Sequence, residues 1–339
     1  MQKLVLDLAF QLCKIPSVTN NENFVCDYLY DYFLAKNFIV QKLFIDNSKR
    51  YNLFICKKSL SNYQTFFCTH LDTVPEFFEP IIDHKQEKLF ARGACDAKGI
   101  AACMIHAFLS LINDGFDDIA LLFTVGEETN SDGAKSLAQN FDKTSKFLVV
   151  GEPTELLFAS EQMGVLAFDL LYSGKKAHSA LPYLGDSAIN KLIIDCFKLI
   201  NYDWSNNLIN LGEIHAGSAR NIIADKAVAK FLMRINQDPQ TVIKTIKTLL
   251  SPNTNLQIIS QSEPFSYLTL PNQKSFVATF GSDAPYFKNI SKHVILTGPG
   301  SLSIAHQDNE FITFEELNNG YLHYIEIAKI LKNGVFNVE

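Results

Sequence analysis

The arrangement of apolar runs in the first 162 residues limits the possible fold more than any other feature of this sequence. Helical patterns alternate there with short β-rich runs: the helical ones are KLVLDLAFQLCK and GIAACMIHAFLSLI, and the β-rich ones are NFIVQKLF, NLFICK, TFFCTH, IALLFTV and KFLVVGEP. Such alternation predicts an α/β domain with a mostly parallel central sheet flanked by helices. Because functional residues of such sheets lie beyond the carboxyl ends of the strands, polar residues after the β-rich runs are the first candidates.

A different pattern occupies residues 163–263. Its predicted order is strand, helix, strand, strand, helix, strand, which describes a small α+β unit with its own core. Beyond it, the β-rich run HVILTG and the helical segment TFEELNNGYLHYIEIAKILKN return to the earlier style. The sequence therefore predicts one domain of residues 1–162 and 264–339, with a second domain of residues 163–263 inserted into it.

Composition excludes several classes of protein. Of the 339 residues, 47% are hydrophobic, but no apolar run approaches the roughly 20 residues of a membrane span. The net charge of −6 and the scattered lysines provide no basic patch for nucleic acid. The seven cysteines include no C-x-x-C pair, which is typical of a reduced chain. We therefore expect a cytoplasmic protein that acts on a small molecule and binds neither nucleic acid nor membranes.

A histidine and an aspartate follow one β-rich run in FFCTHLDTVPE. His70 and Asp72 leave the same face of an extended chain, so the carboxylate could orient the imidazole of a metal ligand. Taken alone, this pair is more typical of an ordinary capped strand end. Asp96, in a glycine-bracketed loop before a helix, is likewise either a candidate ligand or a helix N-cap.

Further polar residues follow other β-rich runs and loops. Glu127 and Glu128 are adjacent where a buried strand should end, an arrangement that suits one metal ligand and one general base but also arises by chance. Glu152 follows the next run, and His306 lies in a loop before the last helix. Together these histidines and carboxylates supply enough nitrogen and oxygen ligands for two divalent ions, with one glutamate left over.

The motifs around these residues resemble those of the co-catalytic zinc amidohydrolases, which include acetylornithine deacetylase, succinyl-diaminopimelate desuccinylase, aminoacylase and carboxypeptidase G. The matching motifs are THLDTVPE, GACDAKG, TVGEETNSDGA, VVGEPTEL, KKAHSALP and GPGSLSIAH, in the family's order and spacing. The resemblance implies two zinc ions, for which cobalt or manganese could substitute. It assigns their ligands by motif: one ion is held by His70, Asp96 and Glu152, and the other by Asp96, Glu128 and His306.

The resemblance also implies the remaining roles. Glu127 would be the general base that takes a proton from the water between the metals, and Asp72 would orient His70. His178, in the inserted domain, would stabilise the tetrahedral oxyanion, often from the neighbouring subunit. The inserted domain would then be both a lid and the dimerisation surface of a homodimer.

Two further features follow from the same resemblance. The segment SARNIIADKAVAKFLMRI matches the lid segment that grips the substrate carboxylate, with Asn221 and Arg234 as the candidate contacts. A cis peptide is expected at Asp96–Ala97.

The substrate is less constrained than the reaction. GPGSLSIAHQDNEF resembles the acetylornithine deacetylase form of its motif, so deacetylation of acetylornithine or acetylcitrulline in arginine biosynthesis is the first expectation. Hydrolysis of N-succinyl-diaminopimelate in lysine biosynthesis is the second, and a metallo-dipeptidase or carboxypeptidase is the third. A metal-binding regulator without activity would not need Glu127. A dinuclear phosphoesterase would need a phosphate-binding loop rich in glycine, which the sequence lacks.

Overall fold

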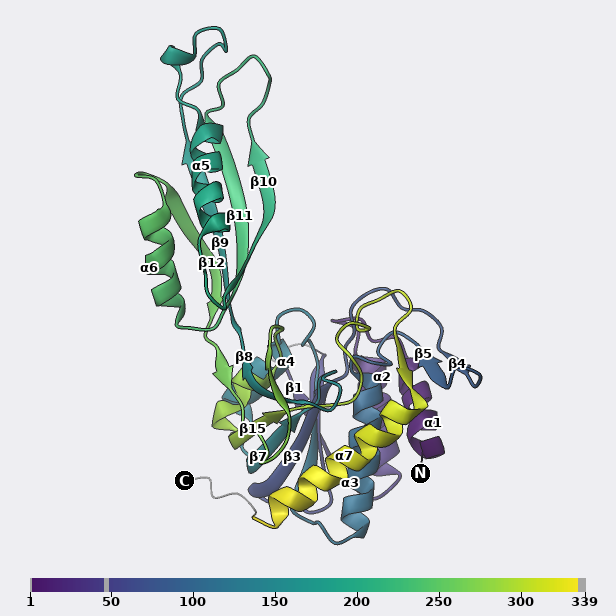
Figure 1. Cartoon of the computed structure of the whole chain (residues 1–339). Helices are drawn as coiled ribbons and strands as arrows, with labels where there is room; N and C mark the ends of the chain where they lie inside the picture. Colours follow the sequence, from purple (N-terminus) through teal and green to yellow (C-terminus); the bar gives the residue numbers. More distant parts are fainter. Residues whose placement is uncertain (1, 46–48, 335–339) are drawn as a thin grey trace. The chain divides into compact units, whose positions relative to one another are not determined.

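The computed structural model describes residues 2–45 and 49–334, which form two compact units (Figure 1). Unit 1 contains the described residues up to 160, residues 267–276 and those from 282 onward. Unit 2 contains residues 161–266 and 277–281. The sequence pattern placed the corresponding changes after residues 162 and 263.

Unit 1 is built on a six-stranded sheet in the order β1, β2, β6, β3, β7, β15. Its strands are β1 (Ile39–Phe44), β2 (Tyr51–Cys56), β3 (Asn62–His70), β6 (Ile119–Thr124), β7 (Thr144–Val150) and β15 (Ser291–Leu296). β6, β3, β7 and β15 run parallel to one another, whereas β1 and β2 pair antiparallel. The α/β prediction is therefore confirmed, with a sheet that is mixed and mostly parallel.

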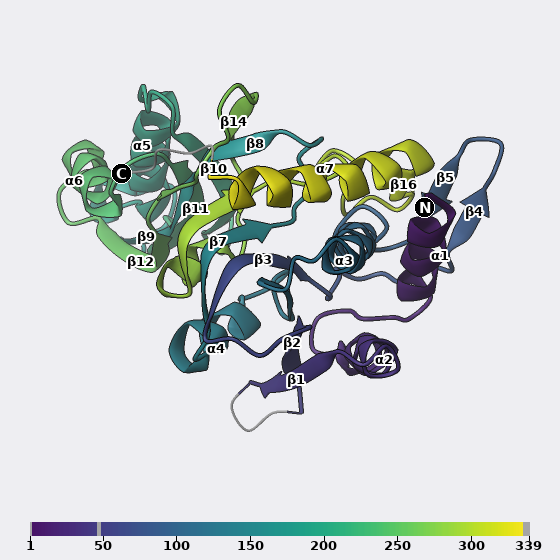
Figure 2. The ribbon, with the colours of Figure 1, turned by 90° about the horizontal axis from the view of Figure 1, so that it is seen from below.

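Helices cover both faces of this sheet. The helices that build the main core are α1 (Gln2–Cys13), α2 (Asn23–Leu34), α3 (Lys98–Asn113) and α7 (Phe314–Lys332) (Figure 2). Residues alternate along β2, so Leu53 and Ile55 join this core while Phe54 points to the opposite face. There Phe54 packs against Phe66 and against Phe141, the residue that follows α4 (Asp132–Asn140).

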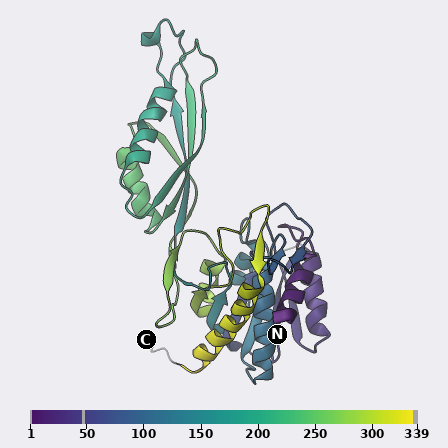
Figure 3. The ribbon, with the colours of Figure 1, turned by 45° about the vertical axis from the view of Figure 1, so that its right-hand side comes forward.

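Unit 2 has a four-stranded antiparallel sheet in the order β10, β11, β9, β12. Its elements are β9 (Gly164–Ser173), α5 (Ala188–Asn201), β10 (Leu208–Ala216), β11 (Lys226–Ile235), α6 (Pro239–Leu249) and β12 (Asn255–Ser262). Buried residues alternate with partly exposed ones along β9, and the buried set packs under α5 and α6. Both helices lie on one face of this sheet (Figure 3). This element order is the one that the sequence predicted.

Smaller elements complete the structure. One three-stranded sheet contains β4 (Ile81–Asp83), β5 (Lys88–Phe90) and β16 (Phe311–Thr313), and another contains β8 (Phe158–Gln162), β13 (Phe265–Ser266) and β14 (Ser275–Ala278). Two 3₁₀ helices are η1 (Pro182–Leu184) and η2 (Ala284–Asn289). None of the helices in the described part of the chain combines the length and apolar character of a membrane span. All seven cysteines are buried and unpaired.

Candidate metal centre

The predicted ligands follow the parallel strands of unit 1. His70 is the last residue of β3, Glu128 follows β6, and Glu152 follows β7. Because parallel strands end at the same edge, the order β6, β3, β7 brings these side chains together. His306 arrives on the loop between β15 and β16, and Asp96 on the loop before α3.

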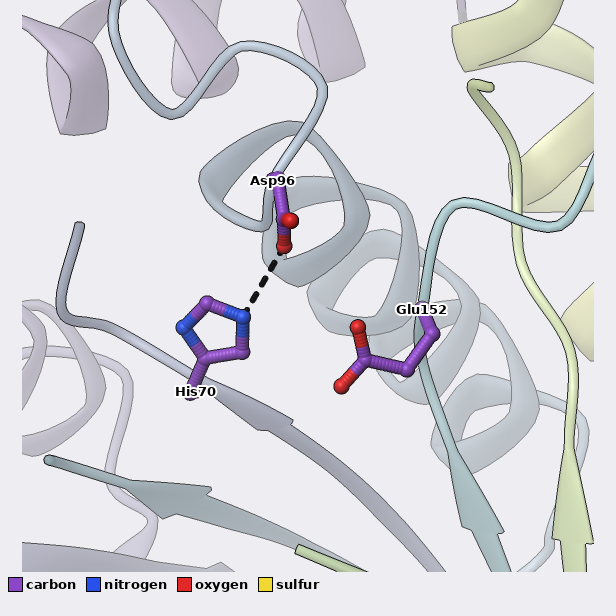
Figure 4. A group of neighbouring side chains, drawn as sticks. All are labelled: His70, Asp96 and Glu152. Atoms are coloured by element: carbon purple, nitrogen blue, oxygen red, sulfur yellow. Dashed lines mark hydrogen bonds and ion pairs between the residues drawn. The ribbon is translucent and has the colours of Figure 1, made fainter. Parts of the chain in front are cut away.

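His70, Asp96 and Glu152 form the first group of possible metal ligands (Figure 4). All three residues are buried, and their nearest ligand atoms lie within 4.8 Å of one another. Nε2 of His70 lies 3.0 Å from Oδ1 of Asp96. The Glu152 carboxylate points toward the other two side chains in Figure 4, as a third ligand would.

Asp96, Glu128 and His306 form a second group within the same 4.8 Å limit. Nε2 of His306 lies 3.0 Å from Oε1 of Glu128 and 3.5 Å from Oδ2 of Asp96. Asp96 is therefore common to both groups, and it presents Oδ1 to His70 and Oδ2 to His306. The two histidines lie on opposite oxygens of one carboxylate, which is the arrangement expected of a bridging ligand.

The alternative role of Asp96 as a helix cap does not apply. The N-cap of α3 is Ala97, and no side chain caps this helix end. The Asp96–Ala97 peptide is cis, which confirms the expectation from the sequence.

Asp72 has a broader structural role than the sequence indicated. Nδ1 of His70 lies 3.0 Å from the main-chain carbonyl oxygen of Asp72 and 3.6 Å from its carboxylate. The carboxylate instead accepts hydrogen bonds from the backbone N–H groups of Glu127 and Glu128, at 3.2 and 3.1 Å, and from the hydroxyl of Thr19. Asp72 therefore holds both His70 and the turn that carries the two glutamates.

Glu127 and Glu152 lack hydrogen-bonding partners of this kind. Among the described residues, none donates a hydrogen bond to either carboxylate. Burial, followed by the charge of Glu152, raises the pKa of Glu127 well above its ordinary value. Burial, followed by the charge of Asp96, raises the pKa of Glu152 in the same way. Both carboxylates would be stabilised in their charged form by a nearby cation.

The histidines influence Asp96 in the opposite direction. Burial acts to raise the pKa of Asp96, but hydrogen bonds with His306 and His70 outweigh it and lower that pKa. The same contacts with Asp96 and Glu128 raise the pKa of His306 to about 10. In this structure the imidazoles therefore supply positive charge to a site that is rich in carboxylates.

The ligand set fits two divalent metal ions. The two groups contain two imidazoles and three carboxylates, the nitrogen and oxygen ligands that zinc accepts in catalytic sites. Divalent ions would also add positive charge beside Glu127 and Glu152, where the charge of His70 alone does not offset the effect of burial on their pKa. Glu127 itself belongs to neither group, as expected for a general base.

The remaining predicted residues lie in unit 2, on two different parts of it. Ser179 N–H donates to the carbonyl oxygen of Asn221 at 3.0 Å, and His178 forms an isolated bridge with Ile222, so the loops of His178 and Asn221 are paired. Arg234 instead pairs with Val165 near the other end of β11. Unit 2 thus brings His178 and Asn221 together but does not bring Arg234 to them.

Asp283 is a carboxylate for which the sequence predicted no role. It lies in GSDAPYF just before η2 and is 2% exposed. Burial raises the pKa of Asp283 to about 6, and its charge contributes to the raised pKa of Glu127 and Glu152. The glycine and serine before it indicate a tight loop, but nothing local to this motif predicts its burial.

The sequence model for "Peptidase family M20/M25/M40" matches residues 66–329, a range that includes both ligand groups. This chain is a member of that family. As an M20-family protein it is a hydrolase of the metallopeptidase-like amidohydrolase type, and enzymes of this family generally bind two metal ions.

Relatives of this M20-family chain are similar over most of their length. A peptidase M20 domain-containing protein of Schizosaccharomyces pombe is 32% identical over 334 residues, which cover 94% of this chain and 83% of the relative. A probable carboxypeptidase of Aspergillus clavatus is 29% identical over 367 residues, covering 96% and 88%. The crystal structure of a Staphylococcus aureus tripeptidase has the same fold, with a TM-score of 0.84 at 20% identity over 98% of this chain and 99% of that one. The acetylornithine deacetylase subgroup stays a prediction.

Proposed function

We propose that this enzyme releases the carboxy-terminal residue of short peptides by metal-dependent hydrolysis of the peptide bond. The proposal depends on one observation, the carboxylate of Asp96 that faces His70 with one oxygen and His306 with the other. The substrate class is suggested by the relatives, among which are a probable carboxypeptidase and, by fold, a tripeptidase.

Two divalent ions, most suitably zinc, would be held by the two ligand groups. When bound, such ions polarise a carbonyl group and make water a better nucleophile near neutral pH. The protein must then fix the ligands, align the substrate and move protons. Asp72 serves the first task, because it holds His70 and the turn of Glu127 and Glu128 in place.

Glu127 is the residue suited to move the proton. Its carboxylate lies outside both ligand groups, and the charges of Glu152 and His70 act on it, so it is close to the reacting region. As the water oxygen bonds to the amide carbon, Glu127 takes a proton from the water. It returns that proton to the amide nitrogen as the C–N bond breaks, which leaves one free amine and one carboxylic acid that ionises at neutral pH by releasing the second water proton.

A second candidate is deacetylation of acetylornithine or acetylcitrulline, as in arginine biosynthesis. The GPGSLSIAH motif favours it, and its loop contacts the segment after Glu152: Ser301 Oγ donates to Oε1 of Glu155 at 2.7 Å, and Glu155 N–H donates to the carbonyl oxygen of Gly300 at 2.8 Å. Desuccinylation of N-succinyl-diaminopimelate is a weaker alternative, because the desuccinylase subgroup carries different residues around the last histidine. All three reactions hydrolyse an amide next to a carboxylate.

Unit 2 would supply substrate binding and assembly. We propose that it serves as the lid and as the surface of a homodimer, with His178 stabilising the oxyanion and Asn221 binding the substrate carboxylate. The pairing of their two loops supports a joint role. Arg234 lacks that support.

The test is amine release from matched substrates, with zinc supplied and with or without a chelator. The decisive pair is a tripeptide blocked at its N-terminus and the same tripeptide amidated at its C-terminus. Acetylornithine, acetylcitrulline and N-succinyl-diaminopimelate are assayed beside them. A carboxypeptidase cleaves the first peptide and spares the second, and the chelator stops it. Preference for acetylornithine would favour the deacetylase function instead. Hydrolysis that continues at the same rate with the chelator present would contradict the metal-dependent mechanism.

A further inference from the structure

Glu310 is a buried acidic residue that belongs to neither ligand group. It lies four residues after His306, in the loop that ends at β16, and none of its surface is exposed. Its side chain reaches the loop that carries Asp96. The mechanism above gives it no function.

Both carboxylate oxygens of Glu310 are engaged. Oε1 accepts hydrogen bonds from the backbone N–H of Cys95 at 2.9 Å and of Asp96 at 3.0 Å. Oε2 accepts a hydrogen bond from Nη1 of Arg92 at 2.8 Å. Glu310 therefore holds the main chain at the residue that both ligand groups share.

Arg92 extends this contact to two other segments. It is 4% exposed, and besides Glu310 it donates to the carbonyl oxygen of Gln307 from Nη1 and to that of Glu76 from Nε, both at 3.2 Å. Gln307 is the residue after His306. The Arg92–Glu310 pair thus fixes the loops of Asp96 and His306 relative to one another.

The same type of contact occurs a second time in the centre. Asp72 accepts hydrogen bonds from two consecutive N–H groups, those of Glu127 and Glu128, as Glu310 does from Cys95 and Asp96. In both cases a buried carboxylate binds the backbone of a loop at the residue whose side chain faces the metal site. Charged acceptors make such bonds stronger than neutral ones do, so they suit the fixing of a loop.

We propose that Glu310 is a positioning residue that fixes the Asp96 carboxylate between the two ligand groups, with Arg92 holding Glu310 and the His306 loop in register. This role rests on the proposed function, because it requires Asp96 to be shared by two ions. This role has a specific consequence. A change at Glu310 acts through Asp96 and should weaken the binding of both ions, whereas loss of a ligand that belongs to one group only would weaken the binding of one ion.

The experiment measures metal binding in the full-length protein with Glu310→Gln. Glutamine keeps the size of the side chain but offers one oxygen, so either Arg92 or the two backbone N–H groups must face its NH₂ group. Loss of such a supporting contact typically weakens metal binding by roughly 10- to 100-fold. Competition with a chromophoric chelator gives both dissociation constants, and the visible absorption of bound Co²⁺ reports the coordination geometry. We expect both constants to rise and the Co²⁺ spectrum to change.

Asp195→Asn is the matched control, because Asp195 is a fully buried carboxylate of unit 2 with hydrogen bonds to backbone and side-chain donors. It should lower thermal stability while leaving Co²⁺ binding and its spectrum unchanged. If Glu310→Gln does not fold, Arg92→Lys, which keeps a positive charge but loses the forked contacts, should weaken both ions by a smaller factor.

The outcomes separate this role from the proposed function. Wild-type protein that takes up two ions and hydrolyses a substrate, together with Glu310→Gln titrations and spectra that superimpose on it, would overturn the positioning role alone. Weaker binding of only one of the two ions would also overturn the positioning role. Wild-type protein that binds no divalent ion would overturn both.

Discussion

Asp195 in unit 2 and two glutamates of the metal centre in unit 1 are acidic side chains that the protein accommodates in opposite ways. Asp195 of α5 is fully buried in unit 2, where Ser251 and Thr254 donate hydrogen bonds to it. Burial acts to raise the pKa of Asp195, but these hydrogen bonds outweigh it and lower that pKa. In unit 1, no described residue donates to Glu127 or Glu152, and burial raises the pKa of both.

The difference separates structural carboxylates from functional ones. A buried charge that is fully hydrogen-bonded costs little to keep, and removing it leaves several donors unpaired. A carboxylate without donors is costly to bury, and it persists where a cation or a reacting proton completes it. By this criterion Asp195 is a structural residue of unit 2, while Glu127 and Glu152 belong to a site.

The largest expected effect is on catalysis, from Glu127→Gln. Removing the group that takes and returns the proton should lower kcat by roughly 10²- to 10⁴-fold, because general acid–base catalysis contributes about that much. Glu127 lies outside both ligand groups, so metal content should remain at the wild-type value. Rates with the preferred substrate and metal analysis of the same sample provide the check.

In unit 2, Asp195→Ala should affect stability and not catalysis. Four donors, from Ser251, Thr254 and Tyr172, would lose their acceptor, and we expect a loss of about 3 kcal/mol in the free energy of unfolding. Urea unfolding measures it. Glu213→Gln is the control, since the exposed Glu213–Lys230 pair should contribute nothing measurable. If Asp195→Ala leaves the free energy of unfolding unchanged, the distinction between structural and functional carboxylates fails.

Much of the fold was predictable because helical patterns and β-rich runs alternate clearly along the sequence. The parallel strands of unit 1 and the element order of unit 2 follow from periodicity. The pattern did not single out α2, whose Tyr28, Tyr30 and Tyr32 favour strands over helices in isolation. It is a helix because Val25, Leu29 and Phe33, spaced by four residues, all pack into the core.

The site was predictable to the extent that its residues follow strands. His70, Glu128 and Glu152 could be found in this way, since parallel strands end at one edge. The contacts of Glu310 with Cys95 and Asp96 could not, because they join two loops that are distant in sequence. Arg234 shows the same limit: its motif suggested a place beside Asn221, but the strand register determines which end of β11 it occupies.

Addition of zinc should stabilise unit 1 selectively. At a free concentration of 100 times the dissociation constant, one bound ion contributes about 2.7 kcal/mol to the free energy of unfolding. Hydrogen exchange should therefore slow in the loops after β3, β6 and β7, while α5 and β12 around Asp195 stay unchanged. Equal protection of both units, or none in unit 1, would contradict the assignment of the unpaired carboxylates to a metal site.

The smallest effect concerns acid stability, where the two units should again differ. Burial lowers the pKa of His323 in unit 1 to about 4, and its Nε2 contacts the hydroxyl of Thr297 at 2.9 Å. Below its ordinary pKa of about 6.5, the unfolded chain takes up a proton here that the folded protein does not accept until about pH 4, so stability falls across that window. The lowered pKa of Asp195 affects a lower pH range. Its contribution to the free energy of unfolding persists down to the ordinary carboxyl range near pH 4 and is lost below it.

His323→Gln isolates this contribution, because glutamine can keep the contact with Thr297 but cannot titrate. Urea unfolding of wild type and variant at pH 7 and pH 4.5, both with chelator present, should show wild type losing roughly 2 kcal/mol more than the variant over that interval. Comparing the two proteins cancels the contributions of Glu127 and Glu152, whose raised pKa values act in the opposite direction, since protonation relieves the cost of burying their charges. Parallel pH profiles for the two proteins would show that His323 is not buried as a neutral group, and they would place the acid sensitivity of unit 1 elsewhere.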